Sequence, residues 1–227
     1  MESTNQPNNC FALLKTPLQE RNEQWNIDFL SEVGAAKFMS ADPQVVYAGD
    51  DNPYFQYFTP TSDKVEHLFS IDNMNKNYLL ENGFGLVINP TEQGVDWMFT
   101  YGELLNYHLN AEFYTLDNQF RSKTGTGVQI LDGEESIRVK AVPEAMLPQM
   151  TCKLLKEFLV ENGISVPKVV LMMRNGVLDI VFNFLPQQFE SQEHYQYVAQ
   201  KISWFLPRHY SFVSVDEAAF GGSFKAL

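Results

Sequence analysis

The clearest alternation of apolar and polar positions lies in the second half of the chain. Residues 137–142 place Ile137, Val139 and Ala141 on one side and Arg138 and Lys140 on the other, which predicts a half-buried strand. A helical period follows over residues 147–162. Asn162-Gly163 then supplies residues that tolerate positive φ, so the sequence predicts a helix that ends there.

The pattern continues with two apolar runs, residues 168–173 and 177–184, joined at Arg174-Asn175-Gly176. Asn-Gly between apolar runs predicts a β-hairpin. Ser191 offers an N-cap for a second helix, Pro207 stops that helix, and residues 210–215 alternate again as a closing strand. The element order is βαββαβ, which predicts a ferredoxin-like α+β fold for this half.

The first half predicts a second, less regular α+β region. We expect helices at residues 26–38, 70–82 and 102–110, and strands at residues 45–48, 54–58, 84–89, 96–101 and 112–116. Residues 117–128 are polar, contain two glycines and carry no periodic pattern, which is typical of a linker. The predicted regions are therefore residues 1–120, acidic and aromatic-rich, and residues 121–227, ferredoxin-like.

One short motif occurs twice. Glu81-Asn82-Gly83 and Glu161-Asn162-Gly163 each end a predicted helix before two strands and another helix. Two copies of an αββα unit would explain this, and so would the common use of Asn-Gly at helix ends.

The first hairpin strand is apolar on both of its faces. Val169, Leu171 and Met173 point one way, and Val170 and Met172 point the other. A strand of this kind is covered on both sides. We expect the predicted helices on one face, and residues before 120 or a second copy of the chain on the other, with the two halves packed against each other.

The net charge of −12 is confined to the first half. Residues 1–120 hold 5 Lys and Arg against 17 Asp and Glu, whereas residues 121–227 hold 11 of each. This charge argues against binding to nucleic acid or to an anionic membrane surface. An acidic region favours a basic protein or peptide partner, because complementary potentials steer association, although a solvated acidic face would look the same.

The start of the chain and its cysteines indicate a compartment. The first residues show no basic segment followed by an apolar one, and no apolar run reaches the ~18 residues that a membrane helix needs. Cys10 and Cys152 are the only cysteines, too few for a disulfide framework. We therefore expect a cytoplasmic protein.

Two segments combine aromatic and acidic residues. Trp97 and Tyr101 share a strand face beside Asp96 and Glu103. The other segment places Tyr54 and Tyr57 near the carboxylates of Asp50 and Asp51. If exposed, such residues would form a binding surface; if buried, they are core. The predicted partner-binding residues are Asp50, Asp51, Tyr54, Tyr57, Asp96, Trp97, Tyr101 and Glu103.

Catalytic and metal-binding motifs are not evident. Ser223 follows two glycines but lies near the C-terminus, Cys152 fits an amphipathic helix, and Lys123 precedes its glycines, unlike a P-loop. His67, with Asp63 and Glu66, lacks a second cluster that would complete metal coordination. We expect no catalytic residues, no metal and no cofactor.

Residues 205–217, Phe-Leu-Pro-Arg-His-Tyr-Ser-Phe-Val-Ser-Val-Asp-Glu, resemble the end of SseB-like domains, bacterial proteins that place a helix, a Leu-Pro break and a closing strand in this order. The resemblance implies a bacterial α+β protein with a non-enzymatic role, and it assigns no residue roles.

The sequence favours an interaction protein, such as a chaperone, an adaptor or an immunity-type binder, that holds a basic partner and can form homodimers. One alternative is an enzyme whose site is assembled from distant residues, for which His67, His108, Asp96 and Glu103 are candidates. The other is a small-molecule-binding regulatory module, which rests on analogy with ferredoxin-like sheets.

Overall fold

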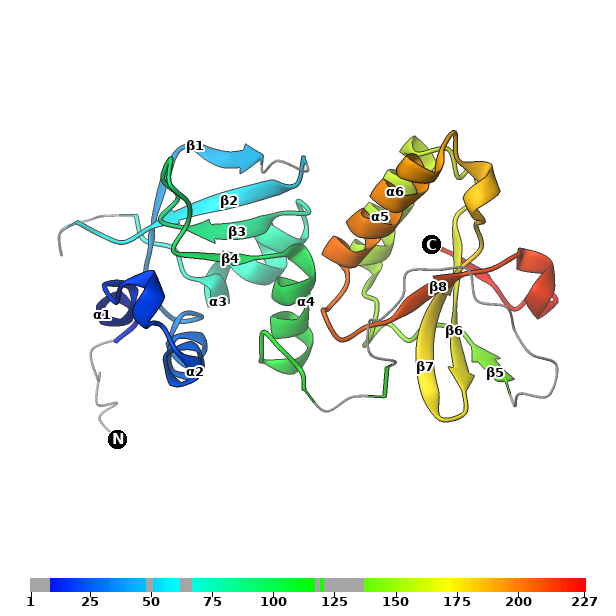
Figure 1. Cartoon of the computed structure of the whole chain (residues 1–227), viewed down its shortest axis with the longest axis horizontal. Coiled ribbons are helices and arrows are strands. Elements are labelled where there is room, and N and C mark those ends of the chain that lie inside the picture. Colours follow the sequence, from blue (N-terminus) through cyan, green and yellow to red (C-terminus); the bar gives the residue numbers. More distant parts are fainter. Residues whose placement is uncertain (1–8, 48–50, 62–66, 117–118, 121–136) are drawn as a thin grey trace. The chain divides into compact units, whose positions relative to one another are not determined.

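The computed structural model describes residues 9–47, 51–61, 67–116, 119–120 and 137–227. The chain forms two units, Met1–Leu104 and Leu105–Leu227, here called the N-terminal unit and the C-terminal unit (Figure 1). The charge pattern of the sequence divides the chain at Phe120, whereas the structure divides it earlier, between Leu104 and Leu105. The predicted linker, residues 117–128, lies outside the described residues apart from Gln119 and Phe120.

The N-terminal unit combines short helices with a four-stranded mixed sheet of order β1-β2-β3-β4. Strand β1 pairs antiparallel with β2, β2 pairs parallel with β3, and β3 pairs antiparallel with β4. Its elements, with α4 running on into the C-terminal unit, are α1 (Cys10–Leu14), η1 (Leu18–Glu20), α2 (Glu23–Glu32), β1 (Met39–Tyr47), β2 (Pro53–Phe58), α3 (Ile71–Met74), η2 (Asn75–Leu80), β3 (Gly85–Ile88), β4 (Trp97–Phe99) and α4 (Tyr101–Asn110).

Capping residues explain where the first helices differ from the sequence-based expectation. Helix α2 begins at Glu23, before the predicted start at residue 26, because the side chain of Asn22 accepts a hydrogen bond from the backbone N–H of Trp25. Ser70 caps α3 in the same way. The predicted helix over residues 70–82 is two elements, since α3 passes into the π-helical turn η2. The strand predicted at residues 112–116 is wrong: this segment is irregular.

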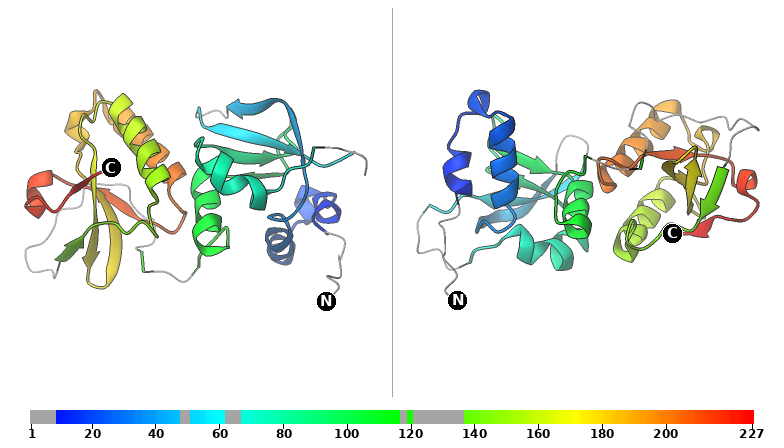
Figure 2. Two further views of the ribbon diagram at one scale, coloured as in Figure 1. Left: turned by 180° about the vertical axis from the view of Figure 1, so that it is seen from behind. Right: turned by 90° about the horizontal axis from the view of Figure 1, so that it is seen from below.

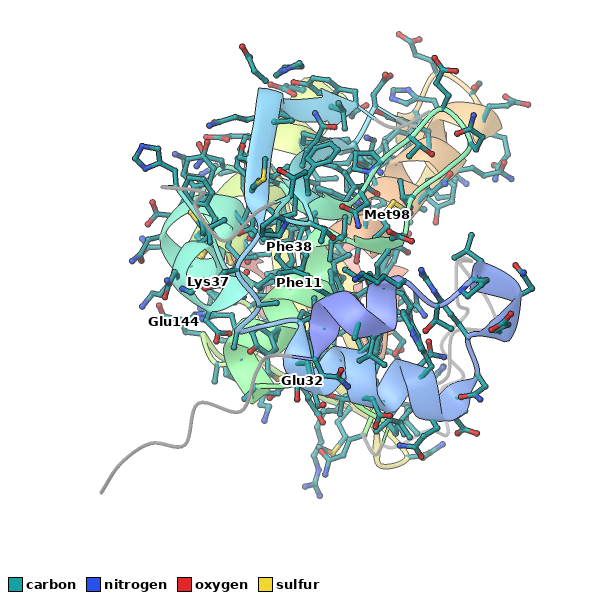
Figure 3. The ribbon with its side chains drawn as sticks, turned by 90° about the vertical axis from the view of Figure 1, so that its left-hand side faces the viewer. Phe11, Glu32, Lys37, Phe38, Met98 and Glu144 are labelled. Atoms are coloured by element: carbon teal, nitrogen blue, oxygen red, sulfur yellow. The ribbon has the colours of Figure 1, made fainter. Side chains whose placement is uncertain are left out.

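The N-terminal unit has an aromatic core. Phe29 and Trp97 lie with ring centroids 5.0 Å apart, and Phe38 stacks on Tyr57 at 5.1 Å. Phe11, from the first helix, meets Phe38 edge to face (Figure 3). Aromatic pairs of this kind stabilise a fold by more than the burial of their area alone. Because these pairs join residues before β1 to residues after it, both segments belong to one core.

The C-terminal unit contains the predicted order βαββαβ. Its elements are β5 (Ile137–Lys140), α5 (Gln149–Glu161), β6 (Lys168–Arg174), β7 (Val177–Phe182), η3 (Pro186–Gln188), α6 (Gln192–Phe205), β8 (Phe212–Ser214), η4 (Glu217–Phe220) and β9 (Lys225–Ala226). The predicted hairpin turn is confirmed, with positive φ at Asn175 (53°) and Gly176 (82°), the backbone that an Asn-Gly hairpin turn requires.

The ferredoxin-like strand arrangement is not confirmed. That arrangement is a split βαβ, in which strands joined by a helix have another strand between them. Here the strand order is β5-β6-β7-β8, so β5 lies directly beside β6 and β7 directly beside β8. Strand β6 pairs antiparallel with both β5 and β7, whereas β7 pairs parallel with β8. The fold class is thus α+β with a mixed sheet in each unit.

Both faces of the C-terminal sheet are buried. Leu171, Ile180 and Phe182 belong to a core with α5 and α6, which lie on the same side of the sheet in Figure 2. Val170 and Met172, on the far face, are 0% exposed, as their apolar pattern predicts.

The cover of the far face includes a segment that the sequence pattern did not single out. Among the described residues, Phe220 and Phe224 of the C-terminal tail pack there from outside the strands. Strand β9 holds this tail by pairing Lys225 with Val169. A tail that follows the last strand was available to cover the sheet without any other part of the chain.

The described helices include none with the length and apolar character needed to cross a membrane.

Candidate interaction surface

The aromatic residues predicted to bind a partner lie inside the N-terminal unit. Tyr54 is 3% exposed, and Tyr57 and Tyr101 are fully buried. Trp97 is half-buried and packs against Trp25 of α2 at 5.7 Å between ring centroids. The prediction of an exposed aromatic surface is therefore wrong, because these rings form the core that joins the helices to the sheet.

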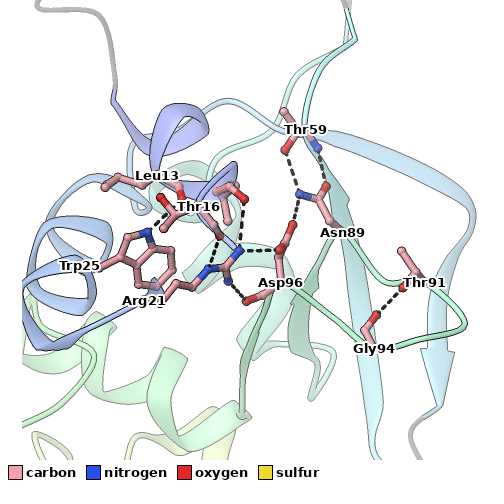
Figure 4. Close-up of polar contacts among 10 residues, drawn as sticks. Leu13, Thr16, Arg21, Trp25, Thr59, Asn89, Thr91, Gly94 and Asp96 are labelled. Carbon is pink, nitrogen blue, oxygen red and sulfur yellow. Dashed lines mark hydrogen bonds and ion pairs between the residues drawn. The ribbon is translucent and has the colours of Figure 1, made fainter. Parts of the chain in front are cut away.

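Asp96 takes part in an internal polar network (Figure 4). Its Oδ1 accepts a hydrogen bond from Nη2 of Arg21 at 2.7 Å, and its backbone carbonyl accepts one from Nη1 at 2.7 Å. Its Oδ2 accepts a hydrogen bond from Asn89 at 2.8 Å. Arg21 also donates to the carbonyls of Leu14 and Thr16 and lies 4.5 Å from the ring of Trp25. The carboxylate therefore fixes the segment before α2 to the sheet.

Glu103 is a helix-capping residue. Its Oε2 accepts a hydrogen bond from the backbone N–H of Thr100 at 2.8 Å, while its own N–H donates to Oγ1 of Thr100 at 3.2 Å. This reciprocal pair is a capping box, and the sequence Thr100-Tyr-Gly-Glu103 carries its signature. Asp51 is exposed and has a positive φ of 58°, and Asp50 lies outside the described residues.

The residues considered for an enzyme include two that are engaged in the architecture. Asp96 and Glu103 hold the contacts just described, whereas His67 is exposed and His108 is half-buried on α4. Within the described ranges, no three His, Cys, Asp or Glu side chains lie close enough together to hold a metal ion.

Neither thiol is activated as a nucleophile. Burial, with a smaller contribution from Glu32, raises the pKa of Cys10 to about 12. Burial also raises the pKa of Cys152, with Glu144 adding to the effect. A cysteine that acts as a nucleophile needs a lowered pKa, and the pKa of each thiol is raised instead; Cys10 is buried and Cys152 is half-buried.

The exposed acidic residues of the N-terminal unit lie on its helices, on strand β1 and in its loops. Among the described residues of this unit, the exposed carboxylates outnumber the exposed cations, which are Lys15, Lys37 and Lys76. Arg21 is withdrawn from the surface by its bonds to Asp96. The exposed carboxylates are those of Glu20, Glu23, Asp42, Asp51, Asp72, Glu81 and Glu92.

Two of these carboxylates are close in sequence to exposed aliphatic side chains. Leu18 and Glu20 belong to η1, and Glu23 and Ile27 lie one turn apart on the solvent side of α2. Leu18 is 64% exposed and Ile27 is 56% exposed. We call these four residues the η1–α2 surface. The Asn22 cap is the sequence signal that would have placed the start of α2.

No family model, no curated protein and no solved structure matches the chain. The resemblance of residues 205–217 to SseB-like domains accordingly stays a prediction.

Proposed function

We propose that this protein is a non-enzymatic interaction protein that binds a basic partner through the acidic surface of its N-terminal unit. The observation that carries the proposal is the η1–α2 surface, where two exposed carboxylates and two exposed aliphatic side chains occur in consecutive elements of the chain. A basic amphipathic segment matches both features, since its cations would meet Glu20 and Glu23 while its apolar side chains cover Leu18 and Ile27.

The distribution of charge supports the same partner class. The excess of carboxylates extends over the N-terminal unit, and a field of one sign speeds the encounter with an oppositely charged molecule. Exposed charge pairs each add little to the free energy of binding, so contacts with the aliphatic side chains would supply the rest of that free energy. The surface thus favours a partner that carries both positive charge and apolar side chains.

A titration with a defined probe tests this proposal. The probe is a short amphipathic Leu/Lys peptide, compared with its Leu/Glu counterpart, at ~20 mM and ~300 mM salt. We expect the Leu/Lys peptide to bind at low salt and to weaken at high salt, and the Leu/Glu peptide not to bind. Absence of binding of the Leu/Lys peptide at low salt would overturn the proposal.

Matched variants locate the surface. Glu20→Gln with Glu23→Gln should weaken binding about fivefold, by the usual energy of two exposed ion pairs. Glu144→Gln with Glu190→Gln removes the same charge from exposed positions of the C-terminal unit and should leave binding unchanged. Equal losses in the two double variants would show that net charge alone attracts the peptide and would reject the η1–α2 surface.

A further inference from the structure

The C-terminal unit contains a cavity of about 380 Å³ where its two parallel strands end. Asn183 directly follows β7, and Asp216 and Glu217 follow β8, so three polar side chains line the cavity from one edge of the sheet. In doubly wound α/β sheets, ligands bind outside the carboxyl ends of the parallel strands, and β7 and β8 are the parallel pair of this mixed sheet. The volume is within the range of small-molecule sites.

The hydrogen bonds around the cavity leave mainly acceptors for a ligand. The amide nitrogen of Asn183 donates to the carbonyl of Val166 at 3.0 Å and to Oε2 of Glu217 at 3.2 Å, so both of its protons are used. Lys168 donates to Oε1 of Glu217. These two donors lower the pKa of Glu217, with Lys168 the larger cause, and the carboxylate is ionised at neutral pH.

Asp216 adds a second carboxylate with spare capacity. Its Oδ1 accepts a hydrogen bond from the backbone N–H of Ala218 at 2.8 Å, and no described residue donates to its Oδ2. Ser165 contributes a hydroxyl to the lining, and Val166, 56% exposed, contributes an aliphatic side chain. Among the described residues, the lining contains these two carboxylates and no cation, and Lys168 forms an ion pair with Glu217 alone of the two.

From this arrangement we infer that the cavity is a binding site for a small aliphatic primary amine. The ammonium group donates to Asp216 and to the hydroxyl of Ser165, near the negative charge of Glu217, and the methylene groups lie against Val166. The site is separate from the η1–α2 surface and does not depend on the proposed function.

Three probes of one length test the inference on the full chain: 4-amino-1-butanol, 1,4-butanediol and 4-hydroxybutanoate. They differ only in a cationic, neutral or anionic end. Two-dimensional ¹H–¹⁵N NMR should show that the amine shifts the amide signals of Ser165, Asn183 and Glu217, with a dissociation constant of about 1 mM. The diol and the hydroxy acid should leave these signals in place.

Two variants and one control complete the test. Asp216→Asn keeps the acceptor for Ala218 but removes a charge, and should weaken amine binding about fivefold. Val166→Lys, at an exposed position, places a competing cation on the lining and should weaken it about tenfold. Glu144→Gln, at an exposed position outside the cavity lining, should change nothing.

The opposite results would overturn the inference: no shift with the amine, equal shifts with the diol, or amine binding that both variants leave intact. The NMR spectra also report whether each variant is folded, so loss of structure would be distinguished from loss of binding.

Discussion

The two units contain the same three-stranded arrangement. In the N-terminal unit, α2 precedes the antiparallel pair β1–β2, and α3–η2 leads to β3, which is parallel to β2. In the C-terminal unit, α5 precedes the antiparallel pair β6–β7, and α6 leads to β8, which is parallel to β7. The repeated Glu-Asn-Gly motif does not mark this equivalence, because it follows the second helix in one unit and the first in the other.

The units differ in how the arrangement is completed. In the N-terminal unit, β4 is added beside β3, and Arg21 ties it to the segment before α2 through Asp96. In the C-terminal unit, β5 and β9 share the free edge of β6, and Phe224 packs on the far face of the sheet. The same three-stranded arrangement is therefore stabilised by the Arg21–Asp96 ion pair in one unit and by apolar side chains of the C-terminal tail in the other. We call these two features the polar closure and the apolar closure.

Removal of the apolar closure should have the largest effect. Phe224→Ala takes a 6% exposed ring from the far face of the C-terminal sheet and should lower the free energy of unfolding of that unit by about 3 kcal/mol. Urea unfolding gives the free energy, and thiol labelling locates the change, since Cys152 lies in this unit and Cys10 in the other.

We expect faster labelling of Cys152 and unchanged labelling of Cys10. Phe220→Ala, at a half-buried position of the same tail, serves as the control and should cost less. If Phe224→Ala raised the labelling rates of Cys152 and Cys10 equally, the tail would not act on the C-terminal unit alone.

Removal of the polar closure should have a smaller effect on the N-terminal unit. Asp96→Ala leaves the guanidinium of Arg21, 7% exposed, with only carbonyl partners and should cost about 2 kcal/mol, below the value for a fully buried pair because Asp96 is 26% exposed. Urea unfolding and thiol labelling again measure the effect, and for this variant we expect faster labelling of Cys10.

Glu92→Ala is the matched control, since it removes an exposed carboxylate from the loop before β4. If Asp96→Ala and Glu92→Ala had equal stability, the ion pair would contribute nothing to closing this sheet.

The smallest effect concerns pH and belongs to the C-terminal unit. Hydrogen bonds from Lys168 and Asn183 lower the pKa of Glu217 below its ordinary value of 4.5. The carboxylate therefore stabilises the folded state fully above pH 4.5, and this contribution is lost as the pH falls through the lowered pKa.

Urea midpoints measured between about pH 3 and pH 6 should fall less steeply with acid in Glu217→Gln than in the original chain. Parallel curves for the two proteins would contradict a stabilising role of this carboxylate.

The sequence by itself determined the elements that depend on neighbouring residues. The Asn175-Gly176 turn, the ends of α5 and α6, and the burial of Val170 and Met172 follow from local chemistry and from a period of two or of 3.6 residues. The capping box of Thr100 and Glu103 could also have been predicted from the sequence, because its two members are three residues apart.

Only the tertiary structure decided what lies across from each element. Periodicity shows that a face is apolar, but it does not identify the segment that covers it, and five further elements separate Phe224 from the strand that contains Met172. For the same reason Tyr57 and Trp97 could be placed in a core or on a surface, and the order β5-β6-β7-β8 could not be distinguished from a ferredoxin-like one. Strand order and burial depend on contacts between distant residues, whose choice is a property of the whole packed unit.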